Sequence, residues 1–148
     1  MTAEAVSDLR RIQGVLGVGV DLCDIRRIAR SLQRFDRRFT ERNFTQAERR
    51  HCDARDATRA HAYAKRWAAK EACAKALGTG FAEGVFLRDI EVETLESGAP
   101  ALRLWGGAAR RLVELTPEGA TARVHVSLTD ETPYAQAFVV IEAALIET

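Results

Sequence analysis

The sequence predicts an α+β fold in one domain, and three observations lead to this prediction. The 148 residues are about the length of a single domain. The composition, 47% hydrophobic and 29% charged residues, is typical of an ordinary globular protein. Segments typical of strands and of helices are mixed without the regular alternation that builds a parallel sheet. We expect an N-terminal arm over residues 1–14 and the domain over residues 15–148.

The first elements are a buried strand and an amphipathic helix. Val15–Leu22 is apolar, β-branched and interrupted by glycines, which favours a buried strand. Asp24 is placed to cap a helix that extends to Phe39. Apolar residues recur at spacings of three and four along this helix, so one stripe should be buried, formed by Ile25, Ile28, Leu32, Phe35 and Phe39.

The middle of the chain predicts a second, longer helix. Residues 40–60 are polar and mixed, which indicates a short helix with loops. His61–Leu77 is rich in alanine and contains good helix formers throughout. Gly78 is well placed as the C-terminal cap of this helix.

The second half predicts four strands and one helix. Phe86–Leu95 and Ala101–Leu104 flank a turn and read as strands. Ala108–Leu115 predicts a short helix. Arg123–Leu128 and Gln136–Glu142 are apolar enough to form two further strands.

Composition excludes several classes of protein. No apolar run approaches the ~20 residues of a transmembrane helix, and the N-terminal residues do not resemble a secretory signal. We therefore expect a cytoplasmic protein without a membrane partner. The three cysteines have no C-x-x-C spacing, so buried thiols are expected rather than a zinc site or a disulfide framework. Most lysines and arginines lie in the first half of the chain, which suits an anionic partner.

Asp21, Glu71 and Lys75 are the candidate site residues. Asp21 ends the first apolar strand, where ligand sites often lie in mixed α/β architecture. Glu71 and Lys75 lie one turn apart on an otherwise apolar helix face. Two carboxylates on adjacent elements could bind Mg²⁺ together with substrate phosphates. The alternative is an ordinary ion pair between Glu71 and Lys75 on a half-exposed helix.

Two further patterns suggest binding surfaces. The run Gly78-Thr79-Gly80 could cradle a phosphate, although helix termination explains its glycines equally well. Arginines recur along one face of the first helix, namely Arg27, Arg30, Arg34 and Arg38. This face suits an acidic helix, or it is only a solvated surface. Nucleic acid is disfavoured because no aromatic residues are interleaved with these arginines.

Five stretches of this chain closely resemble holo-acyl-carrier-protein synthase, the small homotrimeric class of 4′-phosphopantetheinyl transferases. They are GVGVDLCDIRRI (17–28), RWAAKEACAKALGTG (66–80), DIEV (89–92), GAP (98–100) and VHVSLTDETPYAQAFVVIE (124–142). The first two blocks together are highly specific. The match runs in order from about residue 15 to residue 142. It implies a small antiparallel sheet packed with helices, one such unit in each subunit of a trimer with active sites at subunit interfaces.

The resemblance also implies an activity. The 4′-phosphopantetheine arm of coenzyme A (CoA) would move to a serine of an apo acyl-carrier protein, releasing 3′,5′-ADP, in support of fatty acid biosynthesis. Asp21 and Glu71 match the Mg²⁺ ligands, and Lys75 matches a phosphate-contacting lysine. Glu71 is then expected to take the serine proton, directly or through a water. Arg27 falls in the helix that docks the carrier protein.

One departure keeps a second function open. Asp130 stands where the family commonly has a histidine. The alternative function is therefore a noncatalytic module, or one of altered specificity, that binds CoA or a carrier protein.

Overall fold

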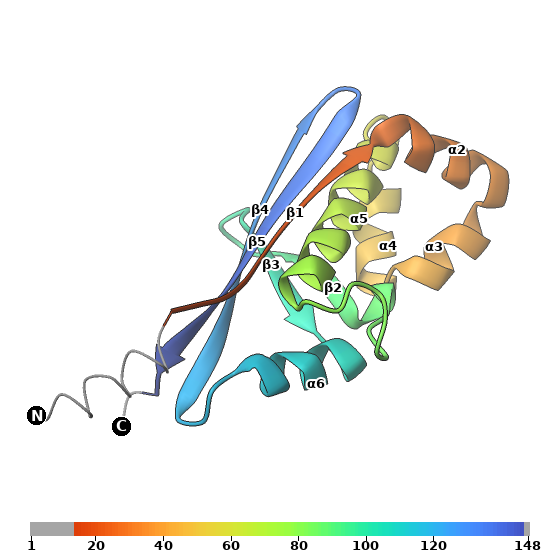
Figure 1. Cartoon of the computed structure of the whole chain (residues 1–148). Helices are drawn as coiled ribbons and strands as arrows, with labels where there is room; N and C mark the ends of the chain where they lie inside the picture. The colour runs from red at the N-terminus through yellow and green to blue at the C-terminus, as the bar shows by residue number, and fades with distance from the viewer. Residues whose placement is uncertain (1–13, 147–148) are drawn as a thin grey trace, which may run out of the picture.

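The computed structural model describes residues 14–146 and confirms the α+β fold class. Three antiparallel strands form the main sheet in the order β1-β5-β4, and helices lie against one side of it (Figure 1). These strands are β1 (Gly14–Asp24), β4 (Ala120–Glu131) and β5 (Tyr134–Leu145). A hairpin of β2 (Ile90–Thr94) and β3 (Pro100–Leu104) forms a second, two-stranded sheet. The predicted arm lies outside the described residues, except for Gly14, at which β1 begins.

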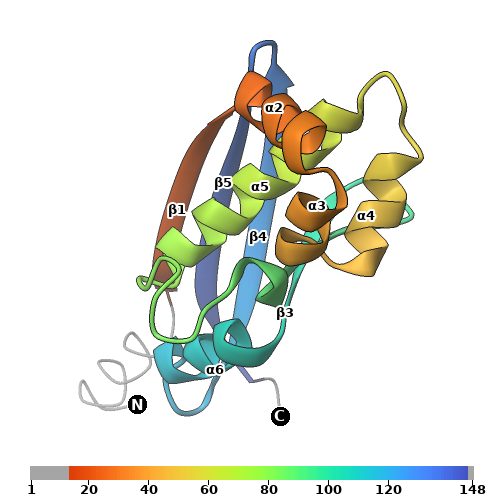
Figure 2. The same cartoon turned by 90° about the vertical axis from the view of Figure 1, so that its right-hand side faces the viewer.

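Helix α5 (Arg59–Ala76) packs directly on the main sheet, as Figure 2 shows. Two glycines of β1 make this close approach possible. A Cβ atom on Gly19 would lie 1.8 Å from the carbonyl oxygen of Ala72, and one on Gly17 would lie 1.9 Å from that of Ala76. The absence of these two side chains therefore sets the distance between β1 and α5.

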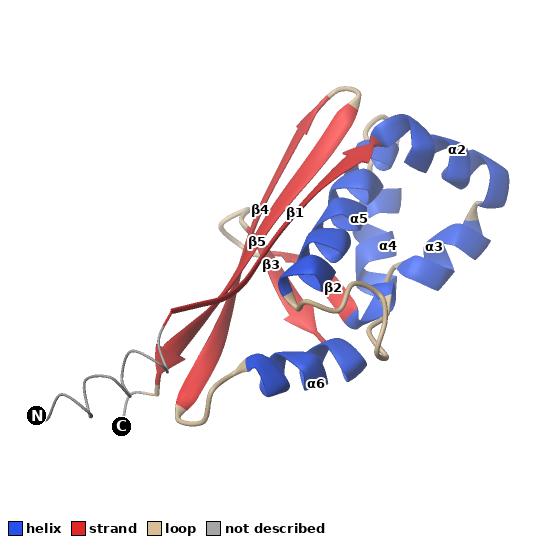
Figure 3. Ribbon diagram, in the orientation of Figure 1, coloured by secondary structure: helices blue, strands red, loops and turns tan. Residues whose placement is uncertain are grey.

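The other face of the main sheet is not covered by any helix of the described chain (Figure 3). Apolar side chains are exposed on this face, among them Val18, Val20, Leu22 and Phe138. Soluble monomers rarely expose contiguous apolar patches of this kind, which usually mark interaction surfaces.

The predicted helix over Ile25–Phe39 is wrong as a single element. The structure has α2 (Ile25–Phe35) and α3 (Arg37–Asn43), separated by Asp36, which has a φ of 43°. The cap at Asp24 is confirmed, because its Oδ1 accepts a hydrogen bond of 2.9 Å from the Arg26 amide. The break also changes the predicted buried stripe, since Phe35 is 46% exposed.

The remaining elements follow the predicted order with shifted ends. Helix α4 (Gln46–Asp53) lies within the polar region, and α6 (Gly106–Leu115) follows the hairpin. The predicted strand over Phe86–Leu95 is wrong at its start. There Asp89 accepts a hydrogen bond from the Phe86 amide and a short 3-10 helix, η1 (Leu87–Asp89), forms before β2.

The three cysteines are free and buried, as predicted. Burial raises the pKa of the Cys73 thiol to about 12, so this thiol stays uncharged at neutral pH. Within residues 14–146, no helix is long and apolar enough to cross a membrane.

Candidate active site

Asp21 of β1 and Lys75 in the last turn of α5 lie together, although β1 continues past Asp21 to Asp24 and does not end at Asp21 as predicted. Lys75 Nζ lies 3.2 Å from Asp21 Oδ1 and also donates a hydrogen bond of 2.9 Å to the carbonyl oxygen of Val20. Asp21 is half-buried, whereas Lys75 is exposed. The ammonium group therefore bridges strand and helix at an edge that a ligand can reach.

Glu71 lies one turn before Lys75 on α5 and is half-buried. Burial raises the pKa of Glu71 above its ordinary value, and the nearby negative charge of Asp21 raises it further. The ion pair of Lys75 is with Asp21, not with Glu71. The structure thus brings Asp21 and Lys75 into contact, places Glu71 one turn away on the same helix as Lys75, and does not form the alternative ion pair of Glu71 with Lys75.

Two carboxylates and one ammonium in this arrangement can bind a cation and a phosphate side by side. Asp21 and Glu71 repel each other when both are ionised, and a divalent cation between them relieves that repulsion. Lys75 contributes a compact positive charge suited to a phosphate oxygen.

The Gly78-Thr79-Gly80 run follows the C-terminus of α5. Gly78 and Gly80 have φ values of 78° and 56°, in the left-handed region that glycine tolerates. Their amides donate to the carbonyl oxygens of Lys75 and Ala74, so helix termination accounts for both. The Thr79 hydroxyl donates to the carbonyl oxygen of Gly80 at 2.9 Å.

The arginine face is divided between two helices. Arg27, Arg30 and Arg34 are exposed on α2, whereas Arg38 is exposed on α3 beyond the break at Asp36. None of the four forms an ion pair with a carboxylate of the described residues. The arginines of α2 line a surface groove of about 640 Å³ whose apolar wall is Phe35, Phe39 and Trp67.

A larger groove, of about 1120 Å³, adjoins the first and shares this apolar wall. Its remaining lining includes Phe81, Phe86 and Arg88, together with Arg38 and Arg42. The sequence patterns do not predict this groove. The signal that the sequence offers for it is a pair of phenylalanines, Phe81 and Phe86, within a glycine-containing segment.

A third, smaller pocket of about 380 Å³ lies near the start of α5 and is basic. Asp130 lines it and forms an ion pair of 3.3 Å with Lys65, rather than joining Asp21 and Glu71. Arg66 is buried in the same wall, and its Nε has no hydrogen-bond partner among the described residues. The remaining basic lining residues are His51, Arg55 and His61.

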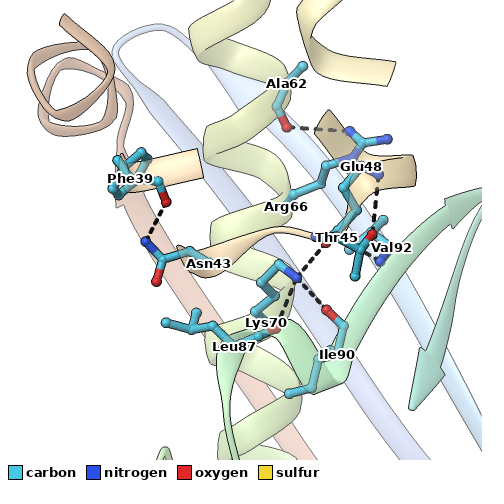
Figure 4. A network of polar contacts seen from close by, with 10 residues as sticks. All are labelled: Phe39, Asn43, Thr45, Glu48, Ala62, Arg66, Lys70, Leu87, Ile90 and Val92. Atoms are coloured by element: carbon cyan, nitrogen blue, oxygen red, sulfur yellow. Dashed lines mark hydrogen bonds and ion pairs between the residues drawn. The ribbon is translucent and has the colours of Figure 1, made fainter. Parts of the chain in front are cut away.

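A buried ion pair holds α5 next to these surfaces (Figure 4). Lys70 and Glu48 are both fully buried, and Lys70 Nζ lies 2.7 Å from Glu48 Oε1. Lys70 also donates to the carbonyl oxygens of Leu87 and Ile90. Glu48 in turn accepts from the amide of Val92 at 3.0 Å. The pair therefore ties α4, α5 and the segment from η1 to β2 to one another.

The sequence pattern that describes the 4′-phosphopantetheinyl transferase superfamily matches residues 17–137 of this chain. The chain belongs to this superfamily. The matched range contains the three site residues, the arginine face and both grooves.

Several similar proteins are named holo-[acyl-carrier-protein] synthase. The holo-[acyl-carrier-protein] synthase of Methylobacterium radiotolerans is 66% identical over 129 residues, which cover 87% of this chain and 94% of that protein. The crystal structure of the synthase from Neisseria meningitidis has a TM-score of 0.75 and 33% identity, covering 86% of this chain and 98% of that one. The Bacillus anthracis synthase, solved in complex with CoA (3′,5′-ADP), has a TM-score of 0.69 and 31% identity, with coverage of 88% and 98%.

Proposed function

We propose that this phosphopantetheinyl transferase moves the 4′-phosphopantetheine arm of CoA to a serine of an apo acyl-carrier protein and releases adenosine 3′,5′-bisphosphate. The observation that carries the proposal is the contact between Asp21 and Lys75 at one accessible edge, with Glu71 one turn before Lys75 on the same helix. The relatives named holo-[acyl-carrier-protein] synthase support it, as does the solved relative in complex with CoA.

Asp21 and Glu71 are the proposed ligands of Mg²⁺. The donor set fits, because Mg²⁺ is commonly bound by one or two carboxylates with waters and substrate phosphates completing its octahedral shell. Asp21 contacts Lys75, and Glu71 lies one turn before Lys75 on α5, so the two carboxylates come from elements that meet at this lysine. When bound, Mg²⁺ would neutralise charge on the pyrophosphate of CoA.

The chain's own residues orient the reactants and move one proton. Lys75 would contact the pyrophosphate and offset the negative charge that grows on the leaving group. Glu71 would take the proton of the carrier serine while the serine oxygen bonds to the phosphorus that carries the pantetheine arm. The bond from that phosphorus to the bridging oxygen then breaks, and 3′,5′-ADP leaves with this oxygen. Gly78, Thr79 and Gly80 are proposed to shape the loop beside the phosphates.

The basic pocket around Arg66 suits the phosphate that CoA carries on its ribose. A buried guanidinium with an unpaired Nε, surrounded by further basic side chains, favours a doubly charged anion. Asp130 and Lys65 would then belong to nucleotide recognition rather than to the metal site.

The carrier protein is proposed to dock on the arginine face. Carrier helices are acidic, and Arg27, Arg30, Arg34 and Arg38 have no carboxylate partner within the described chain. Arg27 lies six residues from Asp21, so docking there would place the serine near the site.

A homotrimer is the proposed assembly, with active sites at the subunit interfaces. The uncovered face of the main sheet supports this proposal, since Val18, Val20 and Phe138 would otherwise remain exposed to water.

The decisive experiment incubates the protein with an apo acyl-carrier protein, CoA and Mg²⁺ and records the mass of the carrier. We expect an increase of roughly 340 Da, the mass of the phosphopantetheine arm. The same assay on Glu71→Gln serves as the control for carrier modified before the experiment. Binding of CoA or of the carrier without any mass increase, across a panel of carriers, would instead favour a noncatalytic binding module.

A further inference from the structure

The C-terminus of α5 lies where the phosphates of CoA are proposed to bind, and its electrostatic sign opposes an anion. The carbonyl groups in the last turn of a helix carry a partial negative charge. Lys75 belongs to this last turn, and the Gly78-Thr79-Gly80 run follows it. A pyrophosphate beside these residues would therefore meet negative charge from the helix itself, and a binding site here needs a group that offsets this charge.

One carbonyl group at this end of α5 is bound by a cation. Backbone amides of the chain occupy the carbonyl oxygens of Cys73, Ala74 and Lys75. Amides are neutral donors, so these hydrogen bonds add no net positive charge. The carbonyl oxygen of Leu77, the C-cap residue, instead accepts a hydrogen bond of 2.9 Å from Nε of Arg111. A positive charge at a helix C-terminus interacts favourably with the helix dipole.

Arg111 reaches this carbonyl oxygen from α6, which lies beyond the C-terminal end of α5 (Figure 1). Helix α6 is packed closely on the turn after α5, because a Cβ on Gly107 would lie 1.9 Å from the carbonyl oxygen of Gly84. Arg111 Nη1 also lies 3.4 Å from Glu114 Oε2, and the Arg111 side chain is only 28% exposed. The guanidinium group is thus held in place, and solvent screens its charge less than that of an exposed arginine.

The same guanidinium group lies against the first residue of the loop that follows α5. A Cβ on Gly78 would be 3.6 Å from Arg111 Nη2, which is ordinary van der Waals contact. We propose that Arg111 is a positioning residue for the transfer: its charge offsets the negative C-terminus of α5 and its side chain supports the Gly78–Gly80 loop, so that this end of the helix accepts the phosphates of CoA. Arg111 acts through the helix end and the loop. This proposal rests on the proposed function, because that function places the phosphates beside this loop.

The test compares Arg111→Gln, Arg111→Lys and Arg110→Gln in the full-length protein. Glutamine keeps a hydrogen-bond donor and removes the charge, whereas lysine keeps the charge. Arg110 is the matched control, because it is the exposed neighbour on α6 and forms no ion pair with a carboxylate of the described residues.

We expect Arg111→Gln to raise the KM for CoA about fivefold, the size of effect that a partly buried charge exerts at a helix terminus. The affinity for 3′,5′-ADP, measured by isothermal titration calorimetry, should fall by a similar factor. Arg111→Lys should restore both quantities to within about twofold of the wild-type values. The KM for the carrier should stay unchanged in all variants, and Arg110→Gln should behave as wild type. A residue that only stabilised the fold would lower the Tm without this selective effect on CoA.

Three outcomes would overturn the role of Arg111. Arg111→Gln could lower the Tm and leave both the KM for CoA and the affinity for 3′,5′-ADP unchanged, which would make Arg111 a structural helix cap only. Arg111→Lys could be as impaired as Arg111→Gln, which would exclude the charge as the cause. The KM for the carrier could rise together with that for CoA, which would indicate a general disturbance of the fold. Failure of the proposed function is a different result, because the wild-type protein would then modify no carrier at all.

Discussion

Lys75 Nζ lies 3.2 Å from Asp21 Oδ1, although 54 residues separate the two along the chain. The contact spans the boundary between strand and helix and leaves the ammonium group exposed. A phosphate that reaches this edge therefore meets a lysine already oriented by a carboxylate and a backbone carbonyl. Such prior orientation lowers the cost of organising charge during the reaction.

The two carboxylates should be indispensable for transfer. We expect Asp21→Ala and Glu71→Ala each to lower kcat by at least about 100-fold, because each removes a hard oxygen ligand and Glu71→Ala also removes the base. The measurement is the rate of carrier modification over a Mg²⁺ titration, with circular dichroism to verify folding. Full activity of either variant at low Mg²⁺ would contradict the assignment.

Stability should depend on pH through Glu71. The pKa of Glu71 is raised in the folded protein above the ordinary value of 4.5. The contribution of Glu71 to the stability of the fold is therefore fully present below pH 4.5 and is lost as the pH rises through the folded pKa. At pH 7.5 without Mg²⁺, Glu71→Gln should therefore have a higher Tm than the wild-type protein, and this gain should disappear at pH 4. Exposed Glu96→Gln is the control. An equal Tm for Glu71→Gln and wild type at pH 7.5 would contradict the expectation that the ionised Glu71 carboxylate destabilises the fold.

Charge reversal on α2 should weaken the binding of the carrier protein and leave the binding of CoA unchanged. We expect Arg30→Glu and Arg34→Glu to raise the KM for the carrier about fivefold and to spare the KM for CoA, since exposed charges act mainly on the encounter rate. Arg27→Glu should have the largest effect, because Arg27 lies closest to Asp21 along the chain. The wild-type KM should also rise with salt. Unchanged carrier KM values would mean that this face is only solvated surface, and the magnesium site would be unaffected.

We expect that breaking the buried Lys70–Glu48 pair lowers the free energy of unfolding by more than the intact pair raises it. Glu48→Gln leaves a neutral amide to face the Lys70 ammonium and the amides of Thr45 and Val92. We expect a loss of about 3 kcal/mol in the free energy of unfolding, measured by urea denaturation. Adding Lys70→Met should recover part of this loss, because the unpaired buried charge is removed. A double variant as unstable as the sum of the single variants would show that no such coupling exists.

Gly19 should tolerate no side chain. An alanine Cβ would lie 1.8 Å from the carbonyl oxygen of Ala72 and 2.9 Å from the amide nitrogen of Ala76, and both are backbone atoms of α5. We expect Gly19→Ala to lower the free energy of unfolding by about 3 kcal/mol or more, because overpacking here must displace a helix. Exposed Val113→Ala should change it by less than about 0.5 kcal/mol. Thermal unfolding of both variants tests this, and a Gly19→Ala protein as stable as wild type would contradict direct packing of β1 on α5.

Local patterns in the sequence were sufficient to predict the two elements that carry the candidate site. The glycine-interrupted apolar run predicted β1, and the alanine-rich run that ends at Gly78 predicted α5. The helix break at Asp36 was missed, because the apolar spacing continues across it and only the positive φ of Asp36 ends the helix. The start of β2 was misplaced because the bond between Asp89 and the Phe86 amide forms a turn in residues that otherwise resemble a strand.

The sequence by itself determined the fold class and the resemblance to the phosphopantetheinyl transferases, and it predicted the candidate site residues Asp21, Glu71 and Lys75. These depend on residue types at short, regular spacings, which the sequence displays directly. Only the tertiary structure decided which carboxylate pairs with Lys75, that Asp130 faces Lys65, and that Lys70 fixes the segment carrying Phe86. Those contacts join residues distant in the chain, and their partners depend on how α5 packs against β1, β4 and the segment from η1 to β2, which no local pattern specifies.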